Sequence, residues 1–404
     1  MSALLLAFFL SGCGAREAMA PLSPSEKLPL DPGRVAQGAR LAALGNCLGC
    51  HTAPGGKPYA GGRALKTPFG TIHGTNITPD PDTGIGRWSQ AAFARAMREG
   101  LDERGRHLYP AFPYEYFTHL TDDDIASLYA FVMTREPVKQ KNPANTIPVP
   151  RFAVAAWNKR YLKPGPIQPD TARSPEWNRG AYLVRSLAHC GACHTPRDRL
   201  GGEKKDADFA GGEAEGWHAP ALNEESPSPV PWTGDALHAY LRTGIADSHA
   251  LTAGPMAEVV RDLRRAPDED VRAIATYIAS LDRRTDEQRR TASNDTAASL
   301  QKVPSENDKG KAIYAGACGD CHDRGRQAEG GALQLPLATG LTLPTARNLA
   351  YIIRQGIEPQ DGERGPWMPA FEGSLSREEL GDLLRYLRSL TGKPPWKDVH
   401  EAER

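Results

Sequence analysis

The chain has 404 residues, of which 40% are hydrophobic and 24% are charged, and at roughly 100–150 residues per domain this length predicts about three domains. Lys and Arg total 49 and so do Asp and Glu, so the formal charge is zero and the composition argues against a nucleic-acid partner. No apolar run reaches the roughly 18 residues of a membrane-spanning helix, so none is expected.

The N-terminus carries a short apolar run, residues 3–10, which ends in Leu10-Ser-Gly-Cys13. An apolar run that ends in small residues predicts a secretory signal peptide, here residues 1–12. The tetrapeptide resembles a bacterial lipobox, which implies cleavage before Cys13 and a lipid on its sulfur; the alternative is an ordinary signal peptide with an incidental cysteine. The first three residues carry no Lys or Arg, so a start further upstream also stays open. Prolines in residues 13–33 predict an extended tether.

The other six cysteines form three Cys-x-x-Cys-His motifs. These are Cys47, Cys50 and His51; Cys190, Cys193 and His194; and Cys318, Cys321 and His322. In such a motif the two thiols add across the vinyl groups of a haem, and the adjacent His binds the iron from one side. The alternatives are a thioredoxin-like redox pair, which needs a βαβ context that the sequence lacks, and a zinc site. The motifs therefore predict three covalently bound haem c groups.

Each motif occupies the same place in a repeated helical pattern. A helix that opens near a glycine precedes the motif, a middle helix ending at a glycine follows it, and an amphipathic helix closes the unit. The opening glycines are Gly38, Gly180 and Gly310, the closing ones are Gly100, Gly244 and Gly356, and the hydroxyls suited to cap the middle helices are Ser89, Thr233 and Thr345. Thr121 with Asp124 and Ser376 with Glu379 resemble capping boxes.

The pattern predicts an all-α protein built from three tandem domains. We expect domain 1 at residues 34–136, domain 2 at 176–282 and domain 3 at 306–391. They are joined by a Pro-rich linker, 137–175, and a polar linker, 283–305, and are followed by a C-terminal tail, 392–404.

The sixth iron ligands follow from a shared offset. Met256 and Met368 stand at the same distance after Gly244 and Gly356, and each lies beside a proline. A thioether suits a haem iron and raises its potential, so both are predicted axial ligands; the alternative is that they are core methionines. In domain 1 the residue at the same distance after Gly100 is Phe112, which cannot bind iron. His107 is a weak candidate there; otherwise the iron is five-coordinate, or holds water or another ligand, including one from another subunit.

The whole arrangement resembles the three-haem cytochrome c subunit of periplasmic membrane-bound dehydrogenases, which implies three class I cytochrome c domains. The matching stretches are Asn76-Ile-Thr-Pro-Asp, Gly84-Ile-Gly-Arg-Trp-Ser, Gly105-Arg-His-Leu-Tyr-Pro-Ala, His189 to Arg197, Gly254 to Val260 and Gly365 to Phe371. Tyr109-Pro-Ala-Phe-Pro-Tyr is more similar to the cytochrome partners of molybdenum hydroxylases acting on nicotinate, isoquinoline or aldehydes than to the alcohol dehydrogenase subunit, which has Met where Phe112 stands.

The resemblance implies an electron-transfer subunit that is not catalytic alone. Its expected partners are a molybdopterin and iron–sulfur dehydrogenase and, as acceptor, quinone or a terminal oxidase; its expected place is the bacterial periplasm, with the lipid on Cys13 as membrane anchor. The alternative function is a haem enzyme, peroxidase-like or gas-binding, that uses an open iron in domain 1.

Overall fold

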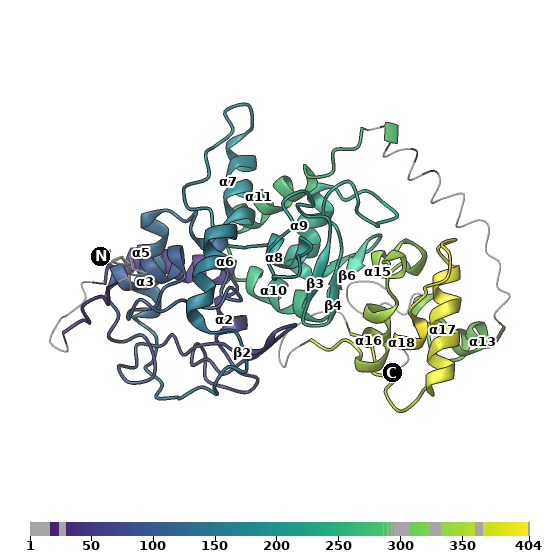
Figure 1. Ribbon diagram of the computed structural model, residues 1–404. Helices are drawn as coiled ribbons and strands as arrows, with labels where there is room; N and C mark the ends of the chain where they lie inside the picture. Colours follow the sequence, from purple (N-terminus) through teal and green to yellow (C-terminus); the bar gives the residue numbers. More distant parts are fainter. Residues whose placement is uncertain are drawn as a thin grey trace, which may run out of the picture.

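The computed structural model describes residues 17–23, 30–285, 287–288, 291, 294, 308–323, 333–359 and 367–402. Figure 1 shows helical units side by side in chain order, from the purple and blue N-terminal part through the teal and green middle to the yellow C-terminal part. Within the described residues, no helix is both long and apolar enough to span a bilayer.

The first unit contains α1 (Pro32–Leu44), α2 (Cys47–Cys50), β1 (Ala64–Thr67), β2 (Gly70–His73), α3 (Gln90–Glu99), α4 (Tyr114–Phe117) and α5 (Asp122–Val132). A 3₁₀ turn, η1 (Arg151–Ala153), and α6 (Val154–Tyr161) follow. The second unit contains α7 (Pro175–Arg185), α8 (Gly191–His194), β3 (Gly212–Ala214), β4 (Trp217–Ala219), α9 (Gly234–Thr243), β5 (Ile245–Ala246), β6 (Ala250–Leu251), α10 (Pro255–Leu263) and α11 (Asp268–Ala279). The third contains α13 (Asp308–Ala317), α14 (Gly319–His322), η2 (Leu335–Leu337), α15 (Thr339–Thr342), α16 (Arg347–Gln355), α17 (Arg377–Ser389) and α18 (Val399–Ala402).

The same crossing of a first and a last helix occurs in each unit: α1 packs on α5, α7 on α11 and α13 on α17. A glycine stands at each contact, because a Cβ on the first helix would lie about 2 Å from a carbonyl oxygen of the last. The distances are 1.9 Å from Gly38 to Ser127, 2.0 Å from Gly180 to Ala273 and 2.2 Å from Gly310 to Asp382. Four residues further along each last helix an aromatic side chain, Phe131, Tyr277 or Tyr386, covers the glycine.

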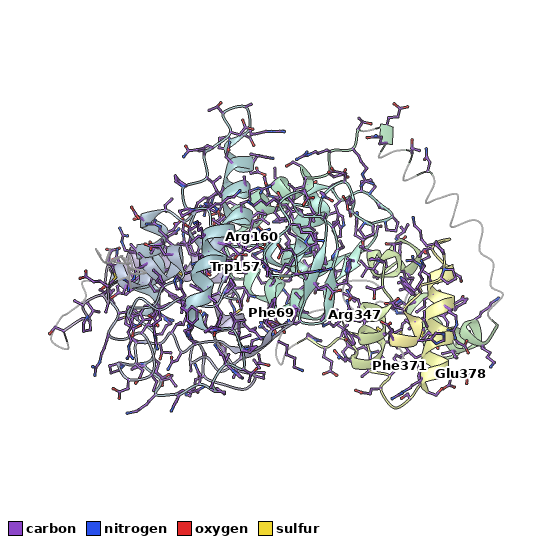
Figure 2. The ribbon with its side chains drawn as sticks, viewed as in Figure 1. Phe69, Trp157, Arg160, Arg347, Phe371 and Glu378 are labelled. Carbon is purple, nitrogen blue, oxygen red and sulfur yellow. The ribbon has the colours of Figure 1, made fainter. Side chains whose placement is uncertain are left out.

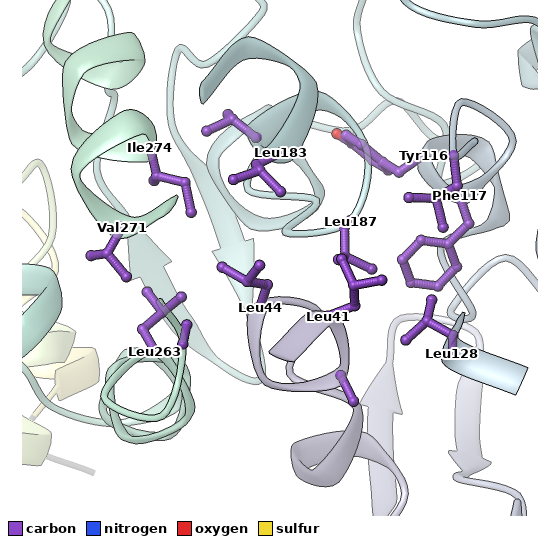
Figure 3. Packing of buried hydrophobic residues seen from close by; sticks show 14 of the residues in the cluster. Leu41, Leu44, Tyr116, Phe117, Leu128, Leu183, Leu187, Leu263, Val271 and Ile274 are labelled. Atoms are coloured by element: carbon purple, nitrogen blue, oxygen red, sulfur yellow. The ribbon is translucent and has the colours of Figure 1, made fainter. Parts of the chain in front are cut away.

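Two hydrophobic clusters form the described core. The first runs without a break through the first and second units, where Leu41 and Leu44 of α1 join Leu183 and Leu187, and Val271 and Ile274 of α11 lie beyond them. Figure 3 shows these side chains together with Leu263 and Leu128. The second cluster holds third-unit residues such as Leu349 and Leu384. The first two units therefore share one core, and the third has its own.

Most predicted helix caps are present. Ser89 and Thr233 accept hydrogen bonds from the amides of Ala92 and Ala236, as N-caps do. The prediction for Thr345 was wrong, because α16 begins one residue later, with Ala346 as its N-cap. The Thr345 hydroxyl instead donates to the carboxylate of Asp398 and accepts from the Arg347 amide.

The two predicted capping boxes and the glycine ends also differ in detail. Ser376 and Glu379 form a complete box, whereas Thr121 caps Asp124 without the return bond. Gly100 and Gly244 end their helices in the left-handed region, while Gly356 has positive φ with extended ψ.

The expectation of a purely α-helical protein left out three short antiparallel hairpins, β1–β2, β3–β4 and β5–β6. Their strands have two to four residues, too short for a recognisable alternation of apolar and polar side chains. The β3–β4 turn rests on Glu215 and Gly216, both with positive φ, as a tight hairpin turn requires. The fold is therefore helix-rich with small sheets.

The segments predicted as tether, linker and tail carry more structure than expected. Residues 17–23 lie along the first unit, where the amide of Met19 donates to Glu103 and that of Leu22 to Arg87. The Pro-rich linker contains α6, and Thr146 within it pairs with Thr71 of β2. In the C-terminal tail, Trp396 is buried and α18 packs on α16 and α17.

Candidate haem-attachment sites

All three Cys-x-x-Cys-His motifs form one turn of helix. The histidine amide donates to the carbonyl of the first cysteine at 3.0 Å in the first motif, 3.1 Å in the second and 3.0 Å in the third. This turn sets the two thiols and the imidazole at positions i, i+3 and i+4, which lie on the same side of a helical turn. The six cysteines are free thiols, of which Cys321 is exposed and the others are half-buried.

The histidine rings are fixed through one nitrogen. The Nδ1 atom of His51 lies 2.7 Å from the carbonyl oxygen of Thr75, and that of His194 lies 2.7 Å from the carbonyl oxygen of Pro220. A carbonyl oxygen can only accept, so Nδ1 carries the proton and Nε2 keeps its lone pair. In the third motif Nδ1 of His322 is buried without a hydrogen-bond partner among the described residues, and burial lowers the pKa of His322 by more than the Leu333 backbone raises it.

Burial favours the neutral form of all three imidazoles, since it lowers the pKa of His51, His194 and His322 below the usual value. A neutral imidazole held through Nδ1 is the form in which histidine binds a metal. The residues present therefore fit a haem iron approached through Nε2.

The thiols do not resemble a redox pair. Burial raises the pKa of Cys47 and Cys190 to about 12, and that of Cys50 and Cys318 to about 11. A catalytic redox cysteine needs a lowered pKa, because the thiolate is the nucleophile. Among the described residues, no group of three or more His, Cys, Asp and Glu side chains is arranged to hold a metal ion.

The two methionines lie after the middle helices, in different local structures. Met256 is in the first turn of α10, which Pro255 opens, and it packs on the core cluster that holds both Cys47 and Cys190. Met368 pairs with Ile357 through two backbone hydrogen bonds of 2.8 Å and packs on the same cluster as Cys318. Met368 thus shares a cluster with its own motif, whereas the cluster of Met256 holds cysteines of two motifs and α10 contacts α2 of the first motif. Axial ligation remains a prediction for both.

Phe112 occupies a half-buried aromatic group in the first unit. Its ring centroid lies 5.4 Å from that of Phe117 and 6.4 Å from that of Tyr114. His107 stands on the wall of a cavity of about 1320 Å³ between the end of α3 and α6, and no residue of the first motif belongs to that cavity's lining. Cys13 lies outside the described residues.

The carbonyls of Thr75 and Pro220 are the site groups that the sequence analysis missed. They act through backbone atoms that every residue has, 24 and 26 positions after the histidines they hold, so no residue type marks them. Only the fold of each loop could have identified them.

Two family models match parts of the chain. Residues 35–136 match the cytochrome c family, and residues 305–387 match the family described as cytochrome C oxidase, cbb3-type, subunit III. These matches contain the first and the third motif.

Relatives extend the similarity over nearly the whole chain. It is 33% identical to the fructose dehydrogenase cytochrome subunit of Gluconobacter japonicus, over 91% of this chain and 82% of that protein. It is 36% identical to the cytochrome c subunit of a quinone alcohol dehydrogenase of Komagataeibacter europaeus, over 90% of this chain and 81% of that protein. It is also 44% identical to a nicotinate dehydrogenase subunit of Pseudomonas putida, over 95% of this chain, but spans only 33% of that longer protein. These similarities give no support to the alternative of a peroxidase-like enzyme.

Proposed function

Because the chain belongs to the family of cytochrome c subunits of dehydrogenase complexes, whose members transfer electrons and are not catalytic alone, we propose that it is the three-haem member of such a complex. In this proposal it takes electrons from a catalytic dehydrogenase subunit and delivers them to quinone or a terminal oxidase. The proposed haem number rests on one observation. A helical Cys-x-x-Cys-His turn occurs three times, each time in a unit whose first and last helices cross at a glycine.

The residues of this chain fasten and orient the three groups. Cys47 with Cys50, Cys190 with Cys193 and Cys318 with Cys321 supply the thioether sulfurs. His51, His194 and His322 supply Nε2 to the iron, and Met256 and Met368 supply a second axial ligand at the second and third sites. A bound haem c supplies an iron that gains or loses one electron.

The first site differs from the others in its surroundings. Phe112, Phe117 and Tyr114 form an aromatic group where the other units place methionine-bearing segments. A phenyl ring cannot donate to iron, so the electron affinity of this site is set without a thioether. We propose that the first site works at a potential distinct from those of the second and third.

We propose that the partner is a molybdopterin and iron–sulfur dehydrogenase acting on an N-heterocycle of the nicotinate type. The support is the 44% identity to the nicotinate dehydrogenase subunit of Pseudomonas putida and the Phe112 sequence context. A neighbouring gene for a molybdopterin-binding subunit and co-purification with its product would support this partner, whereas a quinoprotein or flavoprotein in their place would contradict it.

We further propose that the protein resides in the bacterial periplasm, held at the membrane by a lipid on Cys13. Covalent haem attachment at Cys-x-x-Cys-His motifs fits an exported protein. One lipid gives only marginal anchoring, so further acyl chains or the partner complex are expected to add to it. Mass spectrometry of the mature N-terminus tests this proposal, since an unmodified Cys13 in the membrane fraction would contradict it.

The haem number is tested by pyridine haemochrome analysis and intact mass of the purified protein. We expect three haem c groups per chain and the loss of one in each double variant, C47A/C50A, C190A/C193A and C318A/C321A. Fewer than three in the unchanged protein, or a double variant that keeps all three, would contradict the proposal.

A further inference from the structure

We propose that the hairpin β3–β4 is the junction that couples the second redox site to both of its neighbours, and that its contacts with α16 set the rate of electron transfer between the second and third sites. This inference rests on the proposed function, since it needs haem at each motif. It assigns a role to Glu213, Trp217 and Asn348, none of which belongs to a haem motif.

The base of the hairpin is attached to the second motif at both ends. The amide of Gly211, just before β3, donates to the carbonyl of His194 at 2.8 Å. Pro220, just after β4, accepts the hydrogen bond from His194 Nδ1 at 2.7 Å. A Cβ on Gly212 would lie 2.3 Å from the carbonyl oxygen of Cys193. A displacement of the hairpin therefore moves the groups that orient His194.

The tip of the hairpin reaches the first unit. Glu215 accepts from Arg63 with its two oxygens at 3.2 and 3.0 Å, and Glu258 of α10 accepts from the same guanidinium at 2.7 Å. The Arg63 side chain is only 16% exposed. The Arg63 carbonyl accepts from Gly74, and Gly74 is packed against the carbonyl of Cys50. This cluster of one cation and two anions thus joins the first motif to the hairpin and to the helix of Met256.

The flank of the hairpin contacts the third unit through α16. The Asn348 side chain accepts from the His218 amide at 2.9 Å and donates to the His218 carbonyl at 2.8 Å, so it pairs with β4 as a neighbouring strand would. Arg347 pairs with Glu213 at 2.6 Å, and Figure 2 places Arg347 where the third unit meets the second.

An aromatic pair lies at the same contact. The ring centroids of Trp217 and Tyr351 are 5.2 Å apart, at an interplanar angle of 55°. The Trp217 indole also covers Gly254, where a Cβ would come within 2.4 Å of the ring, and Gly254 stands two residues before Met256. The pair therefore connects the segment of Met256 with the middle helix of the third unit.

The transfer that this junction serves moves one electron from one site to the next. The donor site is oxidised as its neighbour is reduced, and no covalent bond or proton position changes. Such a step depends on how closely and how constantly the two sites are held. Contacts between domains of one chain resemble transient interfaces, so losing a few of them opens the junction for part of the time.

The test is the substitution Asn348→Asp in the full-length haem protein. The carboxylate still accepts from the His218 amide, but it sets an oxygen against the His218 carbonyl where the amide had donated. Flash reduction followed at the separate haem bands measures transfer between the second and third sites. We expect the ratio of open to closed junction to rise about tenfold, the change that corresponds to about 1.4 kcal/mol of lost junction stability, and transfer to slow as the closed fraction falls.

A matched control lies within the second unit. Asn178 accepts from the Asp170 amide at 2.7 Å and donates to the Asp170 carbonyl at 2.8 Å, the same pairing without a contact between units. Asn178→Asp should leave the transfer rate unchanged. A second variant, Arg347→Glu, should slow transfer in the same direction, and its combination with Glu213→Arg should restore it.

Haem content separates the two proposals. If Asn348→Asp keeps three haems and both its transfer rate and its small-angle scattering profile are unchanged, the role of the hairpin is overturned and the proposed function stays intact. Fewer than three haems in the unchanged protein would overturn the proposed function itself. Slower transfer in both Asn348→Asp and Asn178→Asp would also overturn the specific role of the junction.

Discussion

The helix crossing of the third unit is tested by Gly310→Ala. The added methyl group would stand 2.2 Å from the carbonyl oxygen of Asp382 and 2.8 Å from the Cβ of Tyr386, so α13 and α17 must separate to accept it. Overpacking of this kind costs about 1–3 kcal/mol, against about 0.5–1 kcal/mol gained by replacing glycine within a helix. We expect a net loss of about 1–2 kcal/mol, and each kcal/mol lowers the Tm of a domain of this size by about 4–8 °C.

The same helix offers the matched control. Gly316 is exposed, and a Cβ there would meet no atom within 4 Å. Gly316→Ala should therefore raise the stability by about 0.5–1 kcal/mol, opposite in sign to Gly310→Ala. Scanning calorimetry of the haem protein measures both. A Gly310→Ala protein that melts at or above the unchanged protein would refute the close crossing.

Two further predictions concern a buried carboxyl and the axial methionines. Burial raises the pKa of Glu115 to about 7, and Arg197 at 3.6 Å offsets this rise only in part. The protonated Glu115 side chain therefore contributes its full stability below the unfolded pKa of 4.5. This contribution, about 3 kcal/mol in all, is lost as the pH rises through 7. Glu115→Gln should flatten this decline in denaturant melts recorded at several pH values, and an equally steep decline in the variant would count against the assignment. Met256→Ala and Met368→Ala should each change the spin state and potential of one haem only, as measured by absorption spectroscopy and redox titration; a variant with all three haem signals unaltered would show that its methionine is not a ligand.

What could be predicted from the sequence depends on side-chain chemistry and helical periodicity. The Cys-x-x-Cys-His turns, Ser89 and Thr233 as caps, and Gly310 near the start of a helix are local features, and each has a counterpart in the structure at the expected place. Local features suffice there because a cap or a single helical turn is decided by residues within four positions of one another.

The sequence could not predict the contacts between units, for a physical reason. Thr75 and Pro220 act through carbonyl groups, and the pairing of Asn348 with His218 joins residues 130 positions apart. The strands of β3–β4 are too short for periodicity to mark them. The α18 helix, in the segment expected to be a tail, is buried only because α16 and α17 offer an apolar surface to it.

The division of the core explains why these polar contacts matter. Leu187 lies against Gly45, within one hydrophobic cluster that spans the first two units, so these units are expected to unfold together and to keep a fixed spacing. The described core of the third unit is separate. Its contacts with the second unit include two amide hydrogen bonds, an ion pair and a ring pair around β3–β4, and further hydrogen bonds at Ser228, Asp247 and His249. Such contacts are individually weak, so the third unit is the one whose position a partner or a substitution can alter. It should also melt as its own transition, which is why Gly310→Ala can be measured there without disturbing the first two units.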